Sequence, residues 1–284
     1  MEGIVKKHEP EVDASGASDV GLVRQDNQDA IRLPDREHAG ERGWLYAIAD
    51  GMGGYANGRM ASTLALEKLY AAFYEEPGRP VPQALRRGIE SANLDIYKAA
   101  QQMGAGRMGT TVTAACLVGS TLHLAHVGDS RAYRIHQGHA ACLTNDHTTV
   151  GDLVRMKVIS PDKIRTHAQR SVLTKAVGLG LFVQPDVTTH TIDEGDDLVL
   201  CSDGVWSVIE DDEFAALASR TRSAHELSRA LIDLALARET DDNVSAIAIH
   251  IHHLSPAPAR SRRIFSLAQW FSRRQDPILC VGTR

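Results

Sequence analysis

The feature that most restricts the fold is a succession of short β-rich segments near the middle of the chain. Residues 110–118, 121–127 and 130–136 are rich in apolar and β-branched residues, and only Gly-Ser and Gly-Asp dipeptides separate them. Short segments bounded by glycine-containing turns are typical of neighbouring antiparallel strands. The spacing therefore predicts an antiparallel meander over residues 110–136.

Helical patterns flank this region on both sides. Apolar residues recur at helical spacing over 60–74, and a second helix is predicted over 83–103 after a proline-containing break. Two further helices are predicted over 210–218 and 223–237. The remaining strands are predicted over residues 14–20, 43–49, 187–192, 197–202 and 243–252. This order predicts an α+β fold in which helices pack outside antiparallel sheets.

Composition limits the class of protein. Of the 284 residues, 43% are hydrophobic and 24% are charged, as in ordinary soluble globular proteins. The formal net charge of -5 gives no indication of a nucleic-acid partner. No apolar segment reaches the roughly 18 residues of a membrane helix, and the N-terminus lacks the pattern of a signal peptide. We predict a flexible leader over 1–13, one domain over 14–254 and a tail over 255–284.

The tail is rich in arginine. Its segment 262–274 (RRIFSLAQWFSRR) places apolar residues between arginine pairs, which is typical of a short basic amphipathic helix. Such a helix could make a weak contact with an anionic membrane surface or with a partner protein. The alternative is a terminal helix that docks on its own domain or frays.

The four cysteines are Cys116, Cys142, Cys201 and Cys280, and none of them forms a Cys-x-x-Cys pair. This spacing argues against a zinc site built on cysteine. Free thiols in apolar stretches fit a reducing compartment, so we predict a cytoplasmic location.

Aspartates stand beside predicted strand ends. Asp50 and Asp203 follow apolar strands and precede glycine, while Asp129 and Asp242 lie just before strands, and Asp29 is a fifth candidate. Aspartate in such places is a common turn residue, which is the simpler interpretation. If several converge, however, they need cations to offset their repulsion, and oxygen ligands select Mg²⁺ or Mn²⁺. Two such ions can activate a water and hold a phosphoryl group.

Eight segments, in order, resemble the protein phosphatase 2C (PPM) family in its bacterial single-domain form. The resemblance implies a metal-dependent serine/threonine protein phosphatase with a four-layer α-β-β-α sandwich, in which a polar excursion at about 145–168 forms a flap. Its substrates would be phosphorylated proteins, including a cognate bacterial serine/threonine kinase, whose action the phosphatase would reverse. The matching segments are SDVGLVRQDNQDA (18–30), AIADGMGGYANG (47–58), GTTVTAACLV (109–118), LHLAHVGDSRAYRI (122–135), LTNDHT (143–148), QRSVLTKAVG (169–178), DLVLCSDGVWSVI (197–209) and TDDNVSAIAI (240–249).

The resemblance also implies metal ligands. Asp50 matches the carboxylate that bridges two central Mn²⁺ or Mg²⁺ ions, and the carbonyl of Gly51 would join the second ion. Asp203 and Asp242 match the other ligands of the first ion. Asp129 matches a ligand of a third ion. In this reading a metal-activated water hydrolyses the phosphoester directly.

Two further residues complete the implied site. Arg24 matches the arginine that holds the substrate phosphate, and Asp29 would orient the water shell of the second ion. Two positions depart from a common family pattern. Gln28 stands where many relatives have Glu, and Met52 stands where some have a proton-donating His.

Several alternatives remain open at this point. The chain could be an inactive phosphopeptide-binding relative, or another two-metal hydrolase such as a phosphodiesterase or nuclease. Asp146 could approach the third ion or cap the following helix, and we favour the cap. The G-x-G-x-x-G match at 104–109 follows a helix and precedes a strand, so we interpret it as a loop. We interpret four histidines as structural: His123, His126, His250 and His252.

Overall fold

Two antiparallel sheets form the centre of the computed structural model, which describes residues 10–34, 42–53, 55–104 and 107–254. The first sheet has the order β1 (Glu11–Asp19), β11 (Val244–His253), β10 (Asp197–Cys201), β7 (Arg131–His136) and β8 (His139–Cys142). The second has the order β2 (Asp29–Arg32), β3 (Trp44–Met52), β5 (Val112–Val118), β6 (Thr121–Val127) and β9 (Asp186–Thr191), with β4 (Gly109–Thr110) paired to β3.

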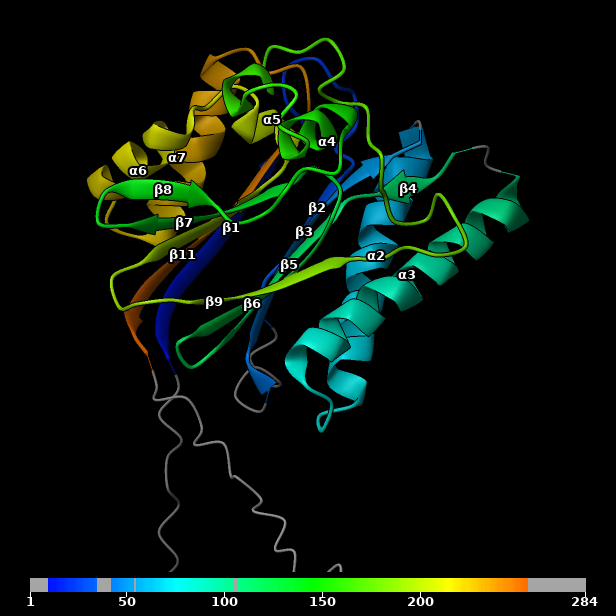
Figure 1. Cartoon of the computed structure of the whole chain (residues 1–284), viewed down its shortest axis with the longest axis horizontal. Coiled ribbons are helices and arrows are strands. Elements are labelled where there is room, and N and C mark those ends of the chain that lie inside the picture. Colours follow the sequence, from blue (N-terminus) through cyan, green and yellow to red (C-terminus); the bar gives the residue numbers. More distant parts are fainter. Residues whose placement is uncertain (1–9, 35–41, 54, 105–106, 255–284) are drawn as a thin grey trace, which may run out of the picture.

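Helices cover the outer faces of both sheets (Figure 1). Helices α2 (Tyr55–Glu75) and α3 (Val81–Met103) pack on the second sheet, and α6 (Asp211–Arg220) and α7 (Ala224–Ala237) pack on the first. Three short helices lie at the upper end of the sandwich: α4 (Thr149–Arg155), the 3-10 helix η1 (Pro161–Lys163) and α5 (Asp203–Trp206). The predicted four-layer α-β-β-α architecture is therefore confirmed.

The alternation of side chains along the strands builds three cores. On β3, Leu45, Ala47 and Ala49 face the helices, whereas Tyr46 and Ile48 face the opposite sheet. Because strand side chains alternate in direction, the next residue on the inter-sheet face is Asp50. The apolar inter-sheet layer thus ends in a carboxylate at one end of the sandwich.

The predicted meander is wrong at its last turn. Strands β5 and β6 pair as expected, but β7 belongs to the other sheet, where it pairs with β10 and β8. The Gly128–Ser130 segment therefore crosses from one sheet to the other instead of closing a hairpin. Gly128 makes this possible with a φ of 111° and a close approach to Thr111, which a β-carbon would meet at 2.5 Å.

Other boundaries differ by a few residues. β1 begins at Glu11, inside the predicted leader, because it extends the pairing with β11 to Glu11↔His253. Helix α2 begins at Tyr55, five residues before the predicted helical pattern over 60–74. The predicted helix over 262–274 lies outside the described residues. Among the helices of the described part, none is both long and apolar enough to cross a membrane.

Candidate metal-binding active site

The polar end of the inter-sheet layer is the candidate site. The register of β2 and β3 places Asp29 directly opposite Asp50. From the first sheet, Ser202 donates a hydrogen bond from Oγ to Asp29 Oδ2 at 2.8 Å, and Ser245 also bonds the Asp29 carboxyl. Strands of both sheets therefore contribute to one cluster. Its carboxyl groups are fixed on rigid elements of the fold.

Asp203 and Asp242 join this cluster from the first sheet. Asp203 is the first residue of α5, just after β10 ends, and Asp242 lies two residues before β11. The Asp50 carboxyl is within hydrogen-bonding reach of the carboxyls of both Asp29 and Asp203. The fold thus brings together residues that lie more than 200 positions apart in the chain.

Asp129 enters from the crossover between the sheets. Its side chain is buried, and its backbone carbonyl accepts a hydrogen bond from Trp206 Nε1 at 2.8 Å. Of the neighbouring charges that raise the pKa of Asp203, that of Asp129 has the largest effect. The same turn that was predicted as a hairpin therefore positions a fifth carboxylate beside Asp29, Asp50, Asp203 and Asp242.

Crowding and burial strongly perturb these acids. Burial raises the pKa of Asp29 to about 6, and burial together with the charge of Asp146 raises the pKa of Asp129 to about 7. Burial and the neighbouring carboxylates also raise the pKa values of Asp50 and Asp203 well above the ordinary range. Such shifts are expected where several acids share a site without counter-charges.

The donor set fits hard divalent cations. Asp29 Oδ1 and Asp203 Oδ1 are buried and find no hydrogen-bond partner among the residues that the structure describes. A buried carboxylate oxygen without a partner is costly, and a cation would remove that cost. Only oxygen ligands meet here, as Mg²⁺ and Mn²⁺ prefer.

The backbone around Gly51 is held closely. Its N–H donates to the carbonyl of Gln28 at 3.1 Å, and a β-carbon at this position would lie 2.1 Å from the carbonyl oxygen of Gly58. Only glycine fits between these two segments. Gly51 therefore lies directly after Asp50 near the end of β3, where its neighbours fix the backbone conformation.

Arg24 lies at the rim of the cluster. Its Nη2 forms an ion pair with Asp242 Oδ2 at 2.7 Å, and its Nε donates to the carbonyl of Asp241 at 3.3 Å. The Arg24 side chain is 52% exposed, whereas that of Asp242 is 26% exposed. One side of this guanidinium therefore remains accessible from solvent next to the carboxylates.

Sequence reasoning missed Asn243 as a site residue. Its amide donates to the carbonyls of Val20 and Asp26 at 2.8 and 3.0 Å, and it accepts from the N–H of Gln28 at 2.9 Å. It thereby fixes the loop that carries Arg24. The sequence signal that could have identified it is its position directly after the two acids Asp241 and Asp242.

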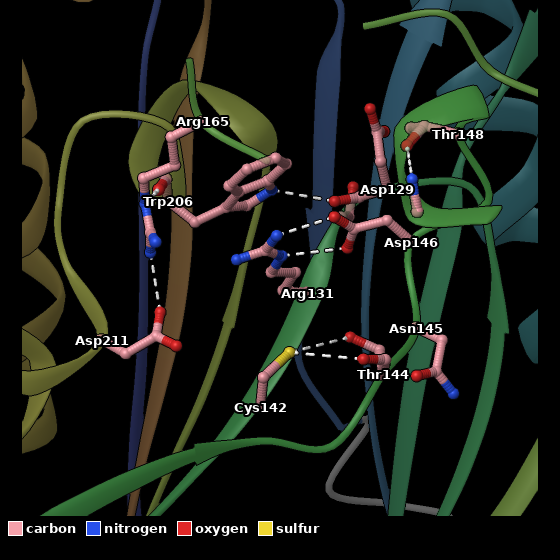
Figure 2. Close-up of polar contacts among 12 residues, drawn as sticks. Asp129, Arg131, Cys142, Thr144, Asn145, Asp146, Thr148, Arg165, Trp206 and Asp211 are labelled. Atoms are coloured by element: carbon pink, nitrogen blue, oxygen red, sulfur yellow. Dashed lines mark hydrogen bonds and ion pairs between the residues drawn. The ribbon is translucent and has the colours of Figure 1, made fainter. Parts of the chain in front are cut away.

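The preferred interpretation of Asp146 as a helix cap is wrong. Thr148 caps α4, since its Oγ1 accepts from the N–H of Gly151 at 2.9 Å. The buried Asp146 carboxylate instead accepts two hydrogen bonds from the Arg131 guanidinium, from Nε at 2.9 Å and from Nη2 at 2.7 Å (Figure 2). Arg131 in turn lies 3.6 Å from the centre of the Trp206 ring. The Arg131–Asp146 pair lies next to Asp129 (Figure 2).

The histidines that were interpreted as structural are bound to their surroundings. His126 hydrogen-bonds Thr113 and stacks on His147, with ring centroids 4.9 Å apart. His250 pairs with Asp197. Burial and the charge of His147 lower the pKa of His126 to about 3. His126 is therefore neutral in the folded chain at ordinary pH.

The comparisons with known proteins agree with this geometry. The family model described as protein phosphatase 2C matches residues 14–152 and 176–244. The chain belongs to the protein phosphatase 2C family. It is therefore a metal-dependent protein phosphatase, as predicted, and nothing found favours an inactive phosphopeptide-binding relative.

Individual relatives are similar over most of this chain. The serine/threonine protein phosphatase PstP of Mycobacterium tuberculosis is 35% identical, over 82% of this chain and 44% of PstP. The serine/threonine phosphatase stp of Listeria monocytogenes is 29% identical, over 82% of this chain and 93% of that protein. The structure of the PstP catalytic domain in complex with two manganese ions has a TM-score of 0.74 and 30% identity, covering 85% of this chain and 98% of that one.

Proposed function

We propose that this chain hydrolyses phosphoserine and phosphothreonine in proteins at the Asp50 cluster. The observation that carries the proposal is a buried group of carboxylates, two of whose oxygens lack partners within the described residues, beside the accessible guanidinium of Arg24. Carboxylates would hold divalent cations, and a guanidinium fork suits a phosphate dianion. Neither feature alone would indicate phosphate chemistry.

We assign the ligands as the family resemblance implies. Asp50 would bridge two Mn²⁺ or Mg²⁺ ions, with Asp203 and Asp242 on the first and the carbonyl of Gly51 on the second. Bound cations would supply an acidified water and offset the charge of the phosphate. Asp129 would hold a third ion, which is supported by its strong electrostatic interaction with Asp203.

The chain's own residues supply the rest of the reaction. Asp29, held by Ser202 and Ser245, would accept hydrogen bonds from the water shell and orient it. Arg24 would hold the phosphate oxygens and stabilise the charge that they carry in the transition state. Its present partner Asp242 would release it on becoming a metal ligand. Met52 has no proton to donate, so the leaving alkoxide would take its proton from water.

The substrates would be phosphorylated proteins, including a cognate serine/threonine kinase. We also propose a cytoplasmic location. Cys116 and Cys201 are buried free thiols and Cys142 is an exposed one, which suits a reducing compartment. A membrane or partner contact through residues 262–274 stays a prediction.

The assay that tests the proposal measures phosphate release from a phosphothreonine peptide with increasing Mn²⁺. We expect hydrolysis that is lost with a chelator and restored by Mn²⁺, and only weak activity on bis-p-nitrophenyl phosphate. Faster hydrolysis of the diester would favour a phosphodiesterase. Peptide binding without turnover would favour a phosphopeptide-binding protein.

Arg24→Lys is expected to lower kcat/KM for the phosphopeptide about tenfold, mainly through KM. Lysine keeps the charge but loses the two-pronged donor geometry that matches a phosphate. Arg24→Met, which also loses the charge, is expected to lower kcat/KM about 10²-fold. Steady-state kinetics measures both effects. Arg229→Lys, an exposed arginine on α7, is the matched control. An unchanged KM in both Arg24 variants would show that Arg24 does not hold the substrate phosphate.

A further inference from the structure

A cavity of about 480 Å³ lies beside the proposed metal site, where the flap meets the first sheet. Its walls come from the β8–α4 connection, helix α4, the η1 region of the flap and the start of α6. Figure 2 shows several of its residues, with the Arg131–Asp146 pair at its inner end and Cys142 and Thr144 along one side. The volume falls within the range of small-molecule and side-chain pockets.

The arginines of the cavity are already paired with acids. Arg131 is held by Asp146, and Arg165 bonds Asp211 at 2.7 Å and Glu210 at 3.0 Å. Arg155 pairs with Asp152, which lies outside the lining. An anionic ligand would therefore have to compete with a carboxylate for each guanidinium.

Two exposed carboxylates of the lining have no arginine partner among the described residues, although Asp162 accepts a hydrogen bond from Ser160 Oγ. Asp162 lies on the flap with its side chain 65% exposed, and its only basic partner among the described residues is the equally exposed Lys163 at 3.2 Å. Asp212, in the first turn of α6, is exposed and forms no ion pair with any residue that the structure describes. Val154, Pro161 and Ile164 contribute apolar atoms to the same lining.

The cavity is also close to the reaction centre. Arg131, part of its lining, lies 3.6 Å from the centre of the Trp206 ring, and Trp206 Nε1 donates a hydrogen bond to the carbonyl of Asp129 at 2.8 Å. An extended peptide advances about 3.3 Å per residue, so a side chain a few residues from a bound phosphoresidue would reach this region. Acidic and apolar side chains in the same lining fit a long aliphatic side chain that ends in a cation.

We propose that this cavity binds an arginine or lysine side chain of the phosphoprotein substrate, close in sequence to the phosphorylated residue. The inference rests on the proposed phosphatase function and adds a substrate class to it. The paired arginines form the framework of the site, while Asp162 and Asp212 attract the incoming cation. The enzyme would then prefer phosphosites with basic neighbours.

The first test compares phosphothreonine peptides that carry arginine, alanine or glutamate at successive flanking positions. We expect kcat/KM to be highest with arginine at one or two positions, and the difference from alanine to shrink in 1 M salt. The Asp162→Asn/Asp212→Asn double variant is expected to lower kcat/KM for the arginine peptide about three- to tenfold, towards that of the alanine peptide. Turnover of p-nitrophenyl phosphate, which has no flanking residue, is expected to stay unchanged.

Asp233→Asn, an exposed aspartate on α7, is the control for a general effect of surface charge. Equal kcat/KM values for arginine and alanine peptides at every position would overturn the proposal. So would an equal loss in Asp233→Asn or on p-nitrophenyl phosphate. If the native chain hydrolysed neither p-nitrophenyl phosphate nor any peptide, the phosphatase assignment itself would fail, which is a distinct outcome.

Cys142 provides a second readout that does not depend on activity. Its thiol lines the cavity, and the other two described cysteines are buried. The Cys142 thiol is exposed, so its alkylation by iodoacetamide can be followed by mass spectrometry at pH 8.5. In a Cys280→Ser chain, a non-hydrolysable phosphonate peptide with arginine is expected to slow this alkylation at least threefold more than its alanine counterpart. Equal protection would count against the proposal.

Discussion

Asp203→Asn is expected to reduce kcat for phosphopeptide hydrolysis by about 10³-fold. The substitution keeps the shape of the side chain but removes the charge of a carboxylate whose Oδ1 is buried and unpartnered within the described residues. Loss of a catalytic cation removes several kcal/mol of transition-state stabilisation, and each 1.4 kcal/mol changes the rate about tenfold. Kinetics with increasing Mn²⁺ measures this loss.

The Asp203→Asn substitution is expected to weaken Mn²⁺ binding as well as to lower activity. Calorimetric titration with Mn²⁺ is expected to show much weaker binding to Asp203→Asn than to the native chain, while circular dichroism shows the same fold. Asp233→Asn, which changes a surface aspartate in the same way, is expected to behave as the native chain does. Native turnover or native Mn²⁺ affinity in Asp203→Asn would mean that the metal ligands are wrongly assigned.

The free energy of unfolding of the metal-free chain is expected to depend on pH through the aspartate cluster. Asp29 has a pKa of about 6 in the folded chain, against 3.8 for an ordinary aspartate. The folded chain therefore holds a proton that the unfolded chain has lost, and this group stabilises the fold less as pH rises from about 4 to about 6. The shift corresponds to a loss of about 3 kcal/mol at most.

Titration of His126 changes the free energy of unfolding in the opposite direction, so its effect must be separated from that of the aspartates. His126 has a pKa of about 3 in the folded chain, against 6.5 for an ordinary histidine, so its contribution to stability rises with pH between these values. The experiment therefore compares urea unfolding of the native chain and of Asp50→Asn, both with chelator, from pH 4.5 to 7.5. His126 is present in both chains, so the difference in slope reports the carboxylates.

We expect Asp50→Asn to gain stability relative to the native chain as pH rises, because one buried charge is gone and Asp29 loses an acidic neighbour. Saturating Mn²⁺ is expected to reverse the order by stabilising the native chain, by about 2.7 kcal/mol at a hundredfold excess over Kd. If the free energies of unfolding of the two metal-free chains changed with pH in parallel, the buried carboxylates would not repel each other as proposed.

The sequence alone determined much of the fold and of the site. Apolar runs on segments such as 43–49 and 197–202 predicted buried strands, and the structure confirms the helix predicted over 83–103 with small changes at its ends. Asp50 and Asp203 could be picked out because each follows such a strand. These signals are local, since they depend on neighbours a few positions apart in the chain.

Tertiary structure decided which sheet each strand joins and which side chains pair. A Gly-Asp turn is compatible with a hairpin, yet packing of two separate sheets sends β7 away from β6 and carries Asp129 into the cluster. The Arg131–Asp146 pair and the amide contacts of Asn243 also depend on segments whose approach is set by the packed layers. A local sequence pattern determines the face of the strand or helix on which a side chain lies. The residue that this side chain contacts across the sandwich is determined only when the sheets and helices bury their apolar faces together.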